Sequence, residues 1–533
     1  MLEVGSKESV VENLLKNRGI KDKEEFFDPP RPDQLITQLR RYLPDLDQNQ
    51  LERAVERIKS AISSGEKIIV WGDFDVDGVT ATAILWQTLK ALSANTLPYI
   101  PDRFTEGYGL NKQGIHQLAD QGVKLIVTVD SGITAKDEVE YANSLGIEVI
   151  VTDHHLEPEE LPPAYAIVQT NELCGAGVAW LLASQLITNH SSLITGFLDL
   201  VAIATIADLQ PLLGVNRSLV KYGFEILNQN KRPGLAALLE VAGLKPGNLG
   251  SYAAGWILGP RINAIGRLKQ GIEALRLLCT QDEIKARELA HLLEAANVKR
   301  QSLTEEIYNH AKGLVTEGDN LIVLYHDSWH EGIIGLVAGK LVEEYGRPAV
   351  VIAKGEEFSK GSARSVNGFN LLEALQNHAD LLEDVGGHEM AAGFTVLNEK
   401  LERFVSALRE EAKEILKTLD PRPVLKIDLE FPLQNLSYEL VAELKKFEPH
   451  GVGNPEPLFA AYGVNVLEER RVGRQRKHLK LLVSPGFEAI WFGHGEEGGF
   501  SLGEEISIAY TPEIERWNDR EKVILKIRDL KKQ

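Results

Sequence analysis

Short apolar runs alternate with amphipathic segments from Lys67 onward, and this alternation limits the possible folds more than any other feature of the sequence. The runs KIIVWG, KLIVTVD and IEVIVTD are rich in β-branched residues, and segments with helical periodicity such as VTATAILWQTLKAL lie between them. Apolar runs of this length, bounded by Gly and Asp, are typical of parallel strands in βαβ units. We therefore predict a doubly wound α/β domain in this part of the chain.

The 533-residue chain is too long for one hydrophobic core, and the rest of it shows two further patterns. A second alternation of NLIVLYH, IIGLVAGKLVEEYG and PAVVIAK predicts a second α/β domain, and a long helical segment precedes it as a connector. After the linker TLDPRPVLKID, short strands and turns predict a small β-barrel. The expected limits are a helical segment over 1–50, the first α/β domain over 51–280, the connector helix over 281–315, the second α/β domain over 316–420 and the barrel over 421–533.

The composition is that of a globular protein, with 44% hydrophobic and 25% charged residues. No apolar run reaches the roughly 18 residues of a membrane helix, and the N-terminus has no apolar signal core, so we expect no membrane association. Two cysteines, Cys174 and Cys279, do not make a disulfide framework, which favours a reducing cytoplasm. We interpret Cys174, in LCGAG, as a small buried residue rather than a nucleophile.

The formal net charge of −19 argues against a polyanionic partner, unless metal ions neutralise many of the carboxylates in the folded protein. Binding of nucleic acid would then depend on local basic surface. The run RRVGRQRKHLK, from Arg470 to Lys480, is the densest cationic stretch of the sequence. A charge run of this kind is also compatible with an ordinary solvated face.

Three aspartates follow the first predicted strand at alternate positions, Asp73, Asp75 and Asp77, and Gly78 closes the motif. The pattern matches the start of a calcium-binding EF-hand loop, but the twelfth position is Ile84 instead of Glu, and a strand replaces the required helix. Capping of the following helix explains one aspartate but not three. Three neighbouring carboxylates therefore predict a cation between them.

Further metal-binding side chains follow the next two predicted strands. Asp130 ends one of them, and Asp153, His154 and His155 end the other. The carboxyl ends of parallel strands converge on one crevice, so we expect these side chains to meet there. Asp208 closes a strongly apolar helix, where an unpaired carboxylate is costly to bury, and we assign it to the same cation site. Such ligands suit Mn²⁺ or Mg²⁺, and several carboxylates can hold two ions about 3.5–4 Å apart for phosphoryl transfer.

The motifs GDFDVDG, VTVDSG, TDHH and ATIAD resemble those of the DHH phosphoesterase superfamily. Together with PDRFTEGYGLN, GPRINAIGRL, WHEGIIGLVAGKL, GSARS, GGHEMAAGF and GVGNPEPLF, they resemble the RecJ family of single-strand-specific exonucleases over nearly the whole chain. The resemblance implies a DHH domain, a DHH-associated substrate-binding domain and an oligonucleotide-binding (OB) barrel. It also implies a metal-dependent enzyme that degrades single-stranded DNA from 5′ to 3′ to mononucleotides, in recombination and repair.

The resemblance further implies roles for the acidic and imidazole side chains. One ion would be held by Asp73 and Asp75, the other by Asp77, His154 and Asp208, and Asp130 would bridge the two. Asp153 would orient an imidazole that binds metal. His155 would lie near the scissile phosphate and stabilise negative charge or protonate the leaving oxygen.

Other residues are assigned to the substrate on the same basis. Ser362 and Arg364, with Arg103 approaching from the first α/β domain, would bind a terminal phosphate, and His388 would contact the nucleotide. The expected DNA contacts elsewhere are Arg261, Asn263 and Arg267, the barrel cations Arg474, Arg476, Lys477 and Lys480, and the barrel aromatics Trp491 and Phe492. The alternatives are a solvated strand end for GSARS, a plain turn for GGH, and a helix cap or structural salt bridge for GPRINAIGR.

Two other functions remain open at this point. One is a DHH-type hydrolase of short oligonucleotides or small phosphate compounds, against which the barrel and the connector argue. The other is a non-catalytic DNA-binding scaffold, which would have lost metal ligands. The family resemblance implies a single-strand-binding protein and a helicase as partners, and we expect a monomer.

Overall fold

The computed structural model describes residues 7–187, 191–268, 271–316, 318–417, 424–517 and 520–532. The chain forms two compact units. The first unit comprises Met1–Pro101, Glu106–Gly259 and Leu425–Gln533, and the second comprises Asp102–Thr105 and Pro260–Val424. The expected domain boundary at residues 420 and 421 lies outside the described residues. No helix in the described part of the chain is long and apolar enough to cross a membrane.

A five-stranded parallel sheet in the order β2-β1-β3-β4-β5 forms the centre of the first unit. Its strands are β1 (Lys67–Trp71), β2 (Thr96–Tyr99), β3 (Val123–Thr128), β4 (Glu148–Asp153) and β5 (Ala166–Gln169). The strands are almost entirely buried, as their near-continuous apolar sequences require. The predicted doubly wound α/β domain is confirmed.

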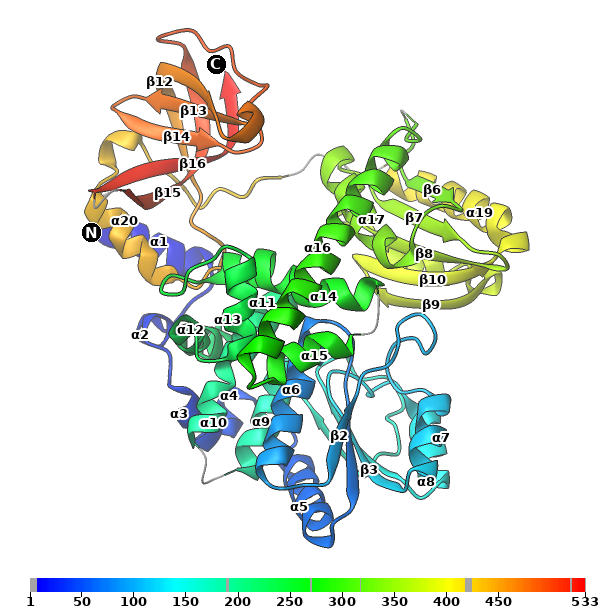
Figure 1. The fold of residues 1–533 in the computed structure, drawn as a ribbon. Helices are drawn as coiled ribbons and strands as arrows, with labels where there is room; N and C mark the ends of the chain where they lie inside the picture. Colours follow the sequence, from blue (N-terminus) through cyan, green and yellow to red (C-terminus); the bar gives the residue numbers. More distant parts are fainter. Residues whose placement is uncertain are drawn as a thin grey trace. The chain divides into compact units, whose positions relative to one another are not determined.

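Helices cover both faces of this sheet (Figure 1). One face packs on α7 (Lys112–Asp120) and α8 (Lys136–Ser144), whose apolar side chains share a core with Ile69, Trp71 and Val151. The other face carries α5 (Gln48–Ser64), α6 (Val76–Ala91) and α9 (Gly175–Leu186). Helix α11 (Leu198–Ala207) is apolar on all sides because it packs on α6, α9 and α12 (Gly214–Gln229) at once.

The remaining helices of the first unit are short. They are α1 (Lys7–Asn17), α2 (Lys23–Phe27), α3 (Pro32–Thr37), α4 (Leu39–Tyr42), α10 (Ser191–Gly196), α13 (Pro233–Val241) and the π-helical turn η1 (Ala253–Leu258). Arg217, fully buried on α12, donates hydrogen bonds to the carbonyl of Phe26 and to the four carbonyls of 446–449. These carbonyls belong to α2 and to the segment just before the barrel. Arg217 on α12 therefore links three segments that are distant in the sequence.

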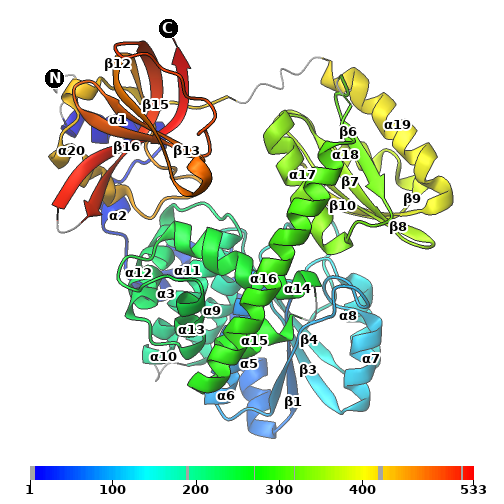
Figure 2. The same cartoon turned by 45° about the horizontal axis from the view of Figure 1, so that its top comes forward.

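The C-terminal part of the first unit is a closed barrel. Strand β12 (Phe459–Val472) pairs with both β13 (His478–Val483) and β15 (Glu505–Trp517), and β14 (Phe487–Trp491) and β16 (Arg520–Lys532) complete the ring. The segment before it contains β11 (Leu429–Glu430), η3 (Leu433–Asn435), α20 (Tyr438–Leu444) and η4 (Lys445–Phe447). Figure 2 shows α1 and α20 beside the barrel, with which they share one core. The predicted barrel is confirmed.

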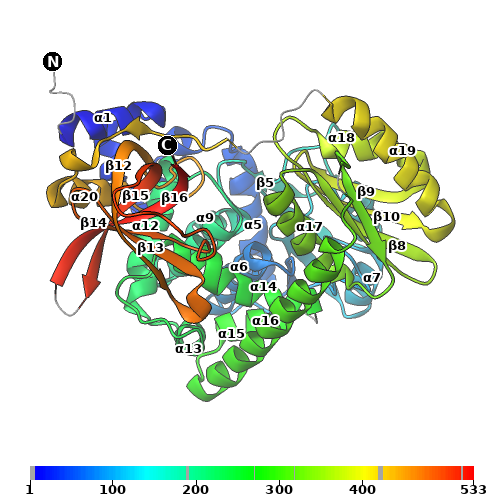
Figure 3. The ribbon, with the colours of Figure 1, turned by 90° about the horizontal axis from the view of Figure 1, so that it is seen from above.

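The second unit contains a mixed sheet in the order β6-β7-β8-β10-β9. Only β6 (Ile322–His326) and β7 (Ala349–Lys354) are parallel, and β8 (Phe358–Arg364), β9 (Leu382–His388) and β10 (Ala391–Leu397) add antiparallel pairs. Helix α17 (Glu331–Tyr345) covers one face, and α18 (Leu371–Gln376) with α19 (Asn398–Leu416) covers the other (Figure 3). The short η2 (Ala379–Leu381) precedes β9.

Three helices precede this sheet, α14 (Gly259–Leu268), α15 (Ile272–Cys279) and α16 (Glu283–Lys312). Helix α16 has 30 residues and begins at the N-cap Asp282, whose carboxylate accepts hydrogen bonds from the amides of Ile284 and Lys285. The long helix expected from the sequence is confirmed.

Candidate metal centre and phosphate site

The turn from β1 into α6 brings the first three aspartates together. Asp75 is the N-cap of α6, and its carboxylate accepts a hydrogen bond of 3.0 Å from the amide of Gly78. A Cβ on Gly78 would lie 2.5 Å from the Cβ of Asp73, so only glycine fits this turn. Capping of α6 therefore accounts for Asp75 alone, while the carboxylates of Asp73 and Asp77 are buried.

The N-terminus of α9 holds Asp77. The amides of Gly175 and Ala176 donate hydrogen bonds of 2.6 and 2.7 Å to the two oxygens of this carboxylate. A Cβ on Gly175 would lie 2.5 Å from the Cβ of Asp130, so the helix end also approaches Asp130 as closely as only glycine allows. The sequence analysis missed these amides, because LCGAG drew attention only to Cys174. That cysteine is buried, as expected, and burial raises the pKa of its thiol.

The predicted acidic and imidazole side chains meet in one cage. His154 Nε2 lies 3.1 Å from Asp130 Oδ1, 3.6 Å from Asp77 Oδ2 and 3.8 Å from Asp208 Oδ2. Three groups each have ligand atoms within 4.8 Å of one another: Asp73, Asp75 and Asp130; Asp77, His154 and Asp208; and Asp130, His154 and His155. Asp130 belongs to two of these groups and follows β3 in a left-handed conformation, with φ 59°.

The electrostatics of the cage call for bound cations. Burial raises the pKa of Asp77 and of Asp130 well above the ordinary range, and neighbouring carboxylates raise both further. The pKa of Asp208 is also raised, chiefly by burial. Burial lowers the pKa of His154, which favours the neutral imidazole that a metal requires. Carboxylates with one imidazole, gathered at these distances, fit hard divalent cations such as Mn²⁺ or Mg²⁺.

Asp153 is buried and hydrogen-bonded on both oxygens. One oxygen accepts 2.7 Å from the ring Nδ1 of His155 and 2.8 Å from the backbone amide of His154, and the other accepts 3.0 Å from the amide of Ile133. Burial would raise the pKa of Asp153, but the His155 hydrogen bond lowers it, and the same contact raises the pKa of His155. The imidazole that Asp153 orients is therefore that of His155, and not that of the expected ligand His154.

Two further residues contact the cage and were not assigned from the sequence. Gln210 Nε2 donates to Asp208 Oδ2 at 2.8 Å and lies 3.4 Å from His154 Nδ1. The Tyr108 hydroxyl donates to the carbonyl of Asp130 at 3.1 Å, and its ring stands edge-on to His155. Two sequence features point to these residues. Gln210 lies two positions after Asp208 in ATIADLQPL, and Tyr108 lies in the motif PDRFTEGYGLN.

Ser362 and Arg364 lie on β8 and His388 lies on β9, on either side of β10 in the second unit. Across β10, Ala391 pairs with Arg364 on one side and His388 on the other, so these side chains share one face. A Cβ on Gly335 of α17 would lie 2.8 Å from Ser362 Oγ and 3.2 Å from Arg364 Nη2. The glycine thus lets α17 approach the hydroxyl and the guanidinium. Burial lowers the pKa of Arg364 from its ordinary value.

Arg103 lies in Asp102–Thr105, which belongs to the second unit, where the Phe104 ring stands edge-on to His330 at 5.8 Å. The expectation that Arg103 approaches from the first α/β domain is therefore wrong, because the aromatic contact holds this short segment in the other unit. Arg267 Nη1 donates to the carbonyl of Gly332 in the first turn of α17.

The two remaining candidates in GPRINAIGR, Arg261 and Asn263, lie on α14. Arg261 forms an ion pair with Glu294 on α16, with Nε 2.5 Å from Oε2. This contact supports the structural salt bridge, which was the alternative to a DNA contact for this residue. Asn263 is half-buried on α14.

The barrel cations Arg474, Arg476 and Lys477 are exposed around the turn η5 (Arg474–Arg476) between β12 and β13. Lys480 is paired with Glu488 at 2.9 Å. Trp491 is only 6% exposed, and its ring stacks on His494 at 3.9 Å. The expectation that Trp491 stacks on bases is wrong, because this side chain belongs to the barrel core, whereas Phe492 is exposed.

Known protein families match three parts of the chain. Residues 67–205 match the DHH family, N-terminal domain, residues 318–414 match the DHHA1 domain, and residues 427–529 match the RecJ OB domain. The chain is 39% identical over 497 residues to a Bacillus subtilis protein named single-stranded-DNA-specific exonuclease RecJ, covering 90% of this chain and 63% of that protein. It therefore spans less than two thirds of that relative.

This chain covers a larger share of a second relative and of a solved structure. The Escherichia coli protein of the same name is 34% identical, with 89% of this chain and 86% of that protein aligned. The crystal structure of RecJ in complex with Mn²⁺ from Thermus thermophilus superposes with a TM-score of 0.84 at 32% identity, covering 98% of this chain and 76% of that one. The same protein has also been solved with Mg²⁺, with a TM-score of 0.77.

Proposed function

Because the chain belongs to the RecJ family of single-stranded-DNA-specific exonucleases, we propose that it hydrolyses single-stranded DNA from the 5′ end to mononucleotides in recombination and repair. One observation carries the proposal: the acidic and imidazole groups predicted to bind metal form three ligand groups that are joined through Asp130 and His154. A non-catalytic scaffold would not keep so many buried carboxylates that repel one another.

Two divalent ions, Mn²⁺ or Mg²⁺, when bound here, would supply a nucleophilic water and neutralise charge on the phosphodiester. Asp73 and Asp75 would hold one ion, and Asp77, His154 and Asp208 the other. Asp130 would be shared by both, since it groups with Asp73 and Asp75 and its Oδ1 lies 3.1 Å from His154 Nε2. The amides of α9 fix the Asp77 carboxylate, and Gln210 fixes that of Asp208.

His155 would act on the leaving oxygen. Its hydrogen bond to Asp153 raises the pKa of the imidazole, which therefore keeps a proton at higher pH than a free histidine. Asp153 itself stays ionised because its pKa is lowered. A protonated His155 can stabilise charge on the phosphate or transfer its proton to the departing 3′ oxygen.

Residues of the second unit would bind the 5′-terminal phosphate. Ser362 offers a hydroxyl and Arg364 a forked cation on one strand, and His388 lies in the same row of the sheet. Arg103 and Arg267 are the further cations that we assign to this phosphate. In the barrel, Arg474, Arg476 and Lys477 would bind the strand through its backbone charge.

We keep the domain limits of 51–280, 316–420 and 421–533 as part of this proposal, since the three family matches fall inside them. We also propose a monomer in the cytoplasm that works with a single-strand-binding protein and a helicase. Sedimentation over a range of concentrations, and titration with each purified partner, would check these two points.

The test is digestion of 5′- and 3′-labelled oligonucleotides, single- and double-stranded, with Mn²⁺, Mg²⁺ or a chelator. We expect release of 5′-labelled mononucleotide from single strands, with metal only. Hydrolysis of a dinucleotide without hydrolysis of long single strands would instead favour a hydrolase of small phosphate compounds. Binding of the strands without cleavage would favour the scaffold.

A further inference from the structure

The π-helical turn η1 carries two large aromatic side chains that the proposed mechanism does not use. Tyr252, just before this turn, is 70% exposed and Trp256 within it is 73% exposed. Large aromatic side chains are usually buried, and two exposed ones four residues apart on a helix lie on the same side. π-helical turns are rare and occur often at functional sites. The pair therefore indicates a binding surface.

The C-terminal end of η1 packs against the segments that bear the metal-ligand candidates. A Cβ on Gly255 would lie 3.0 Å from Ile206 Cγ2, and one on Gly259 would lie 3.5 Å from Ala207 Cβ and 3.9 Å from Val76 Cγ2. Ala207 immediately precedes Asp208, and Val76 lies between Asp75 and Asp77. Trp256, next to Gly255, therefore belongs to a turn that packs on the C-terminal end of α11.

A third exposed apolar side chain, Leu209, lies next to a metal-ligand candidate in the sequence. Leu209 directly follows Asp208, is 69% exposed and adopts a left-handed conformation with φ 58°. This conformation is unfavourable for leucine and persists only where the surroundings impose it. Leu209 is therefore an exposed apolar side chain directly beside the candidate ligand Asp208.

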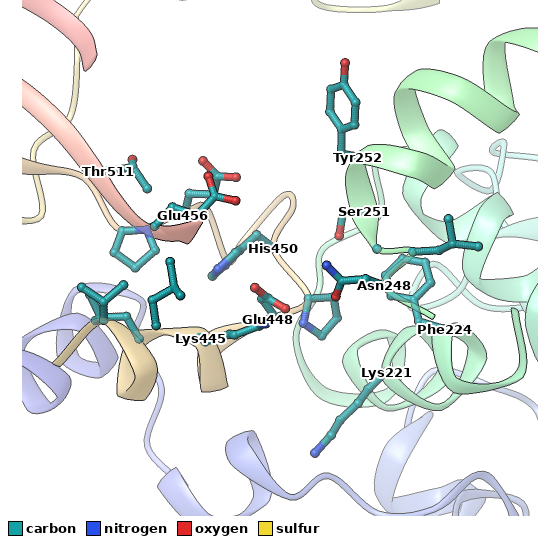
Figure 4. Close-up of a pocket in the computed structure, with 18 of the residues that line it drawn as sticks. Lys221, Phe224, Asn248, Ser251, Tyr252, Lys445, Glu448, His450, Glu456 and Thr511 are labelled. Atoms are coloured by element: carbon teal, nitrogen blue, oxygen red, sulfur yellow. The ribbon is translucent and has the colours of Figure 1, made fainter. Parts of the chain in front are cut away.

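The Tyr252 end of η1 borders a cavity of about 650 Å³ that the barrel also lines, through Thr511 and Glu513 of β15 and Lys526 of β16. Figure 4 shows Ser251 and Tyr252 on one side and His450 and Thr511 on the other. Ser251 Oγ, His450 Nδ1 and Thr511 Oγ1 are buried and have no hydrogen-bond partner among the described residues.

The chemistry of this surface suits bases better than phosphates. The cavity is lined by three lysines and four glutamates, so it has no cationic character to attract the backbone. Aromatic faces bind any base by stacking and need no positive charge. In a chain with a net charge of −19, stacking offers a way to hold a polyanion beside a cluster of carboxylates.

We propose that Tyr252 and Trp256 form a stacking platform for successive bases of the strand on its way from the barrel to the metal centre. The inference rests on the proposed exonuclease function and adds to it two positioning residues on the DHH side of the substrate path. Each stacked base contributes enough binding free energy to change affinity by about fivefold to a hundredfold.

The experiment compares Trp256→Leu with Trp256→Phe, and Tyr252→Leu with Tyr252→Phe, on a single strand of about 20 nucleotides and on a dinucleotide. We expect each Leu variant to raise KM for the long strand by about fivefold or more, with kcat changed less, and each Phe variant to retain near-normal KM. Hydrolysis of the dinucleotide should be unchanged, which also shows that the metal centre is folded. Phe358→Leu, which removes an exposed ring from the far end of β8, is the control.

An abasic substitution in the strand tests stacking directly. One abasic position should weaken binding to the unmutated protein, and Trp256→Leu should add no further loss with that strand. Equal loss by the Leu and Phe variants, or equal loss on intact and abasic strands, would overturn the platform. If the unmutated protein cleaves no DNA, the exonuclease proposal fails, while the fluorescence change of 2-aminopurine strands with and without Trp256 still decides stacking.

Discussion

The candidate metal centre of the first unit and the candidate phosphate site of the second unit arise from similar sequence alternations but have opposite charge. In the parallel sheet, side chains that follow β1, β3 and β4 meet at one edge, so residues from successive loops form an acidic cage. In the mixed sheet, the register of antiparallel strands aligns Arg364 and His388 on either side of Ala391. The comparison shows that sheet topology decides whether a site is assembled along the edge of a sheet or across its face.

The two sites also differ in how they hold charge. The cage buries carboxylates against one another, and amides of α9 and the side chain of Gln210 hold two of them in place. The phosphate site places one guanidinium beside a hydroxyl, with a glycine of α17 close by. Buried carboxylates in such a cage favour bound cations, whereas a guanidinium beside a hydroxyl suits an anionic ligand.

The largest expected effect comes from the residue shared by two ligand groups. Asp130→Ala should lower hydrolysis of single-stranded DNA by about 10³-fold or more, which corresponds to roughly 4 kcal/mol of transition-state stabilisation. Circular dichroism should show an unchanged fold. Near-normal turnover of this variant with added Mn²⁺ would refute the bridging role.

A smaller loss is expected from the phosphate site, and it should depend on the substrate. Arg364→Lys keeps the charge but loses the forked geometry, so kcat/KM for 5′-phosphorylated strands should fall by about 10- to 100-fold. Strands without the 5′ phosphate should lose little. Lys360→Ala, on the same strand, is the matched control, and an equal loss for both kinds of strand would argue against phosphate binding.

The barrel should contribute less and in a salt-dependent way. Replacing Arg474, Arg476 and Lys477 together by Ala should reduce the slope of log affinity against log salt by about 2, since each single-strand phosphate contact contributes roughly 0.7. Binding titrations between about 50 and 300 mM salt would measure this slope. An unchanged slope would identify the basic turn as an ordinary solvated surface.

The smallest effect is on thermal stability, and it distinguishes the roles of the two sites most clearly. Mn²⁺ should raise the melting temperature of the protein by a few degrees, since a ligand at about a hundredfold excess over Kd adds roughly 3 kcal/mol. Asp130→Asn should raise the melting temperature of the metal-free protein, because it removes one buried repulsive charge, and should reduce the gain from Mn²⁺. Arg364→Lys should leave the Mn²⁺ gain unchanged in the same thermal scans. A full Mn²⁺ gain in Asp130→Asn would place the ions elsewhere.

Much of the metal centre was predictable because its parts are local. Alternating β-branched runs, each followed by Asp or His, are enough to place Asp77, Asp130 and His154 at neighbouring strand ends. Prediction failed where a side chain depends on contacts far away in the sequence. Trp491 looked available for bases, but the closed barrel buries it, and Arg103 follows Phe104 into the second unit.

By itself, the sequence determined the parallel sheet, the acidic strand ends and the barrel, since strand period, apolar pattern and chain order are properties of short segments. The tertiary structure alone decided that Asp153 orients His155, that the amides at Gly175 and Ala176 hold Asp77, and that Tyr252 and Trp256 stay exposed. These outcomes depend on which segments pack together, and packing between distant residues is not encoded in any one of them.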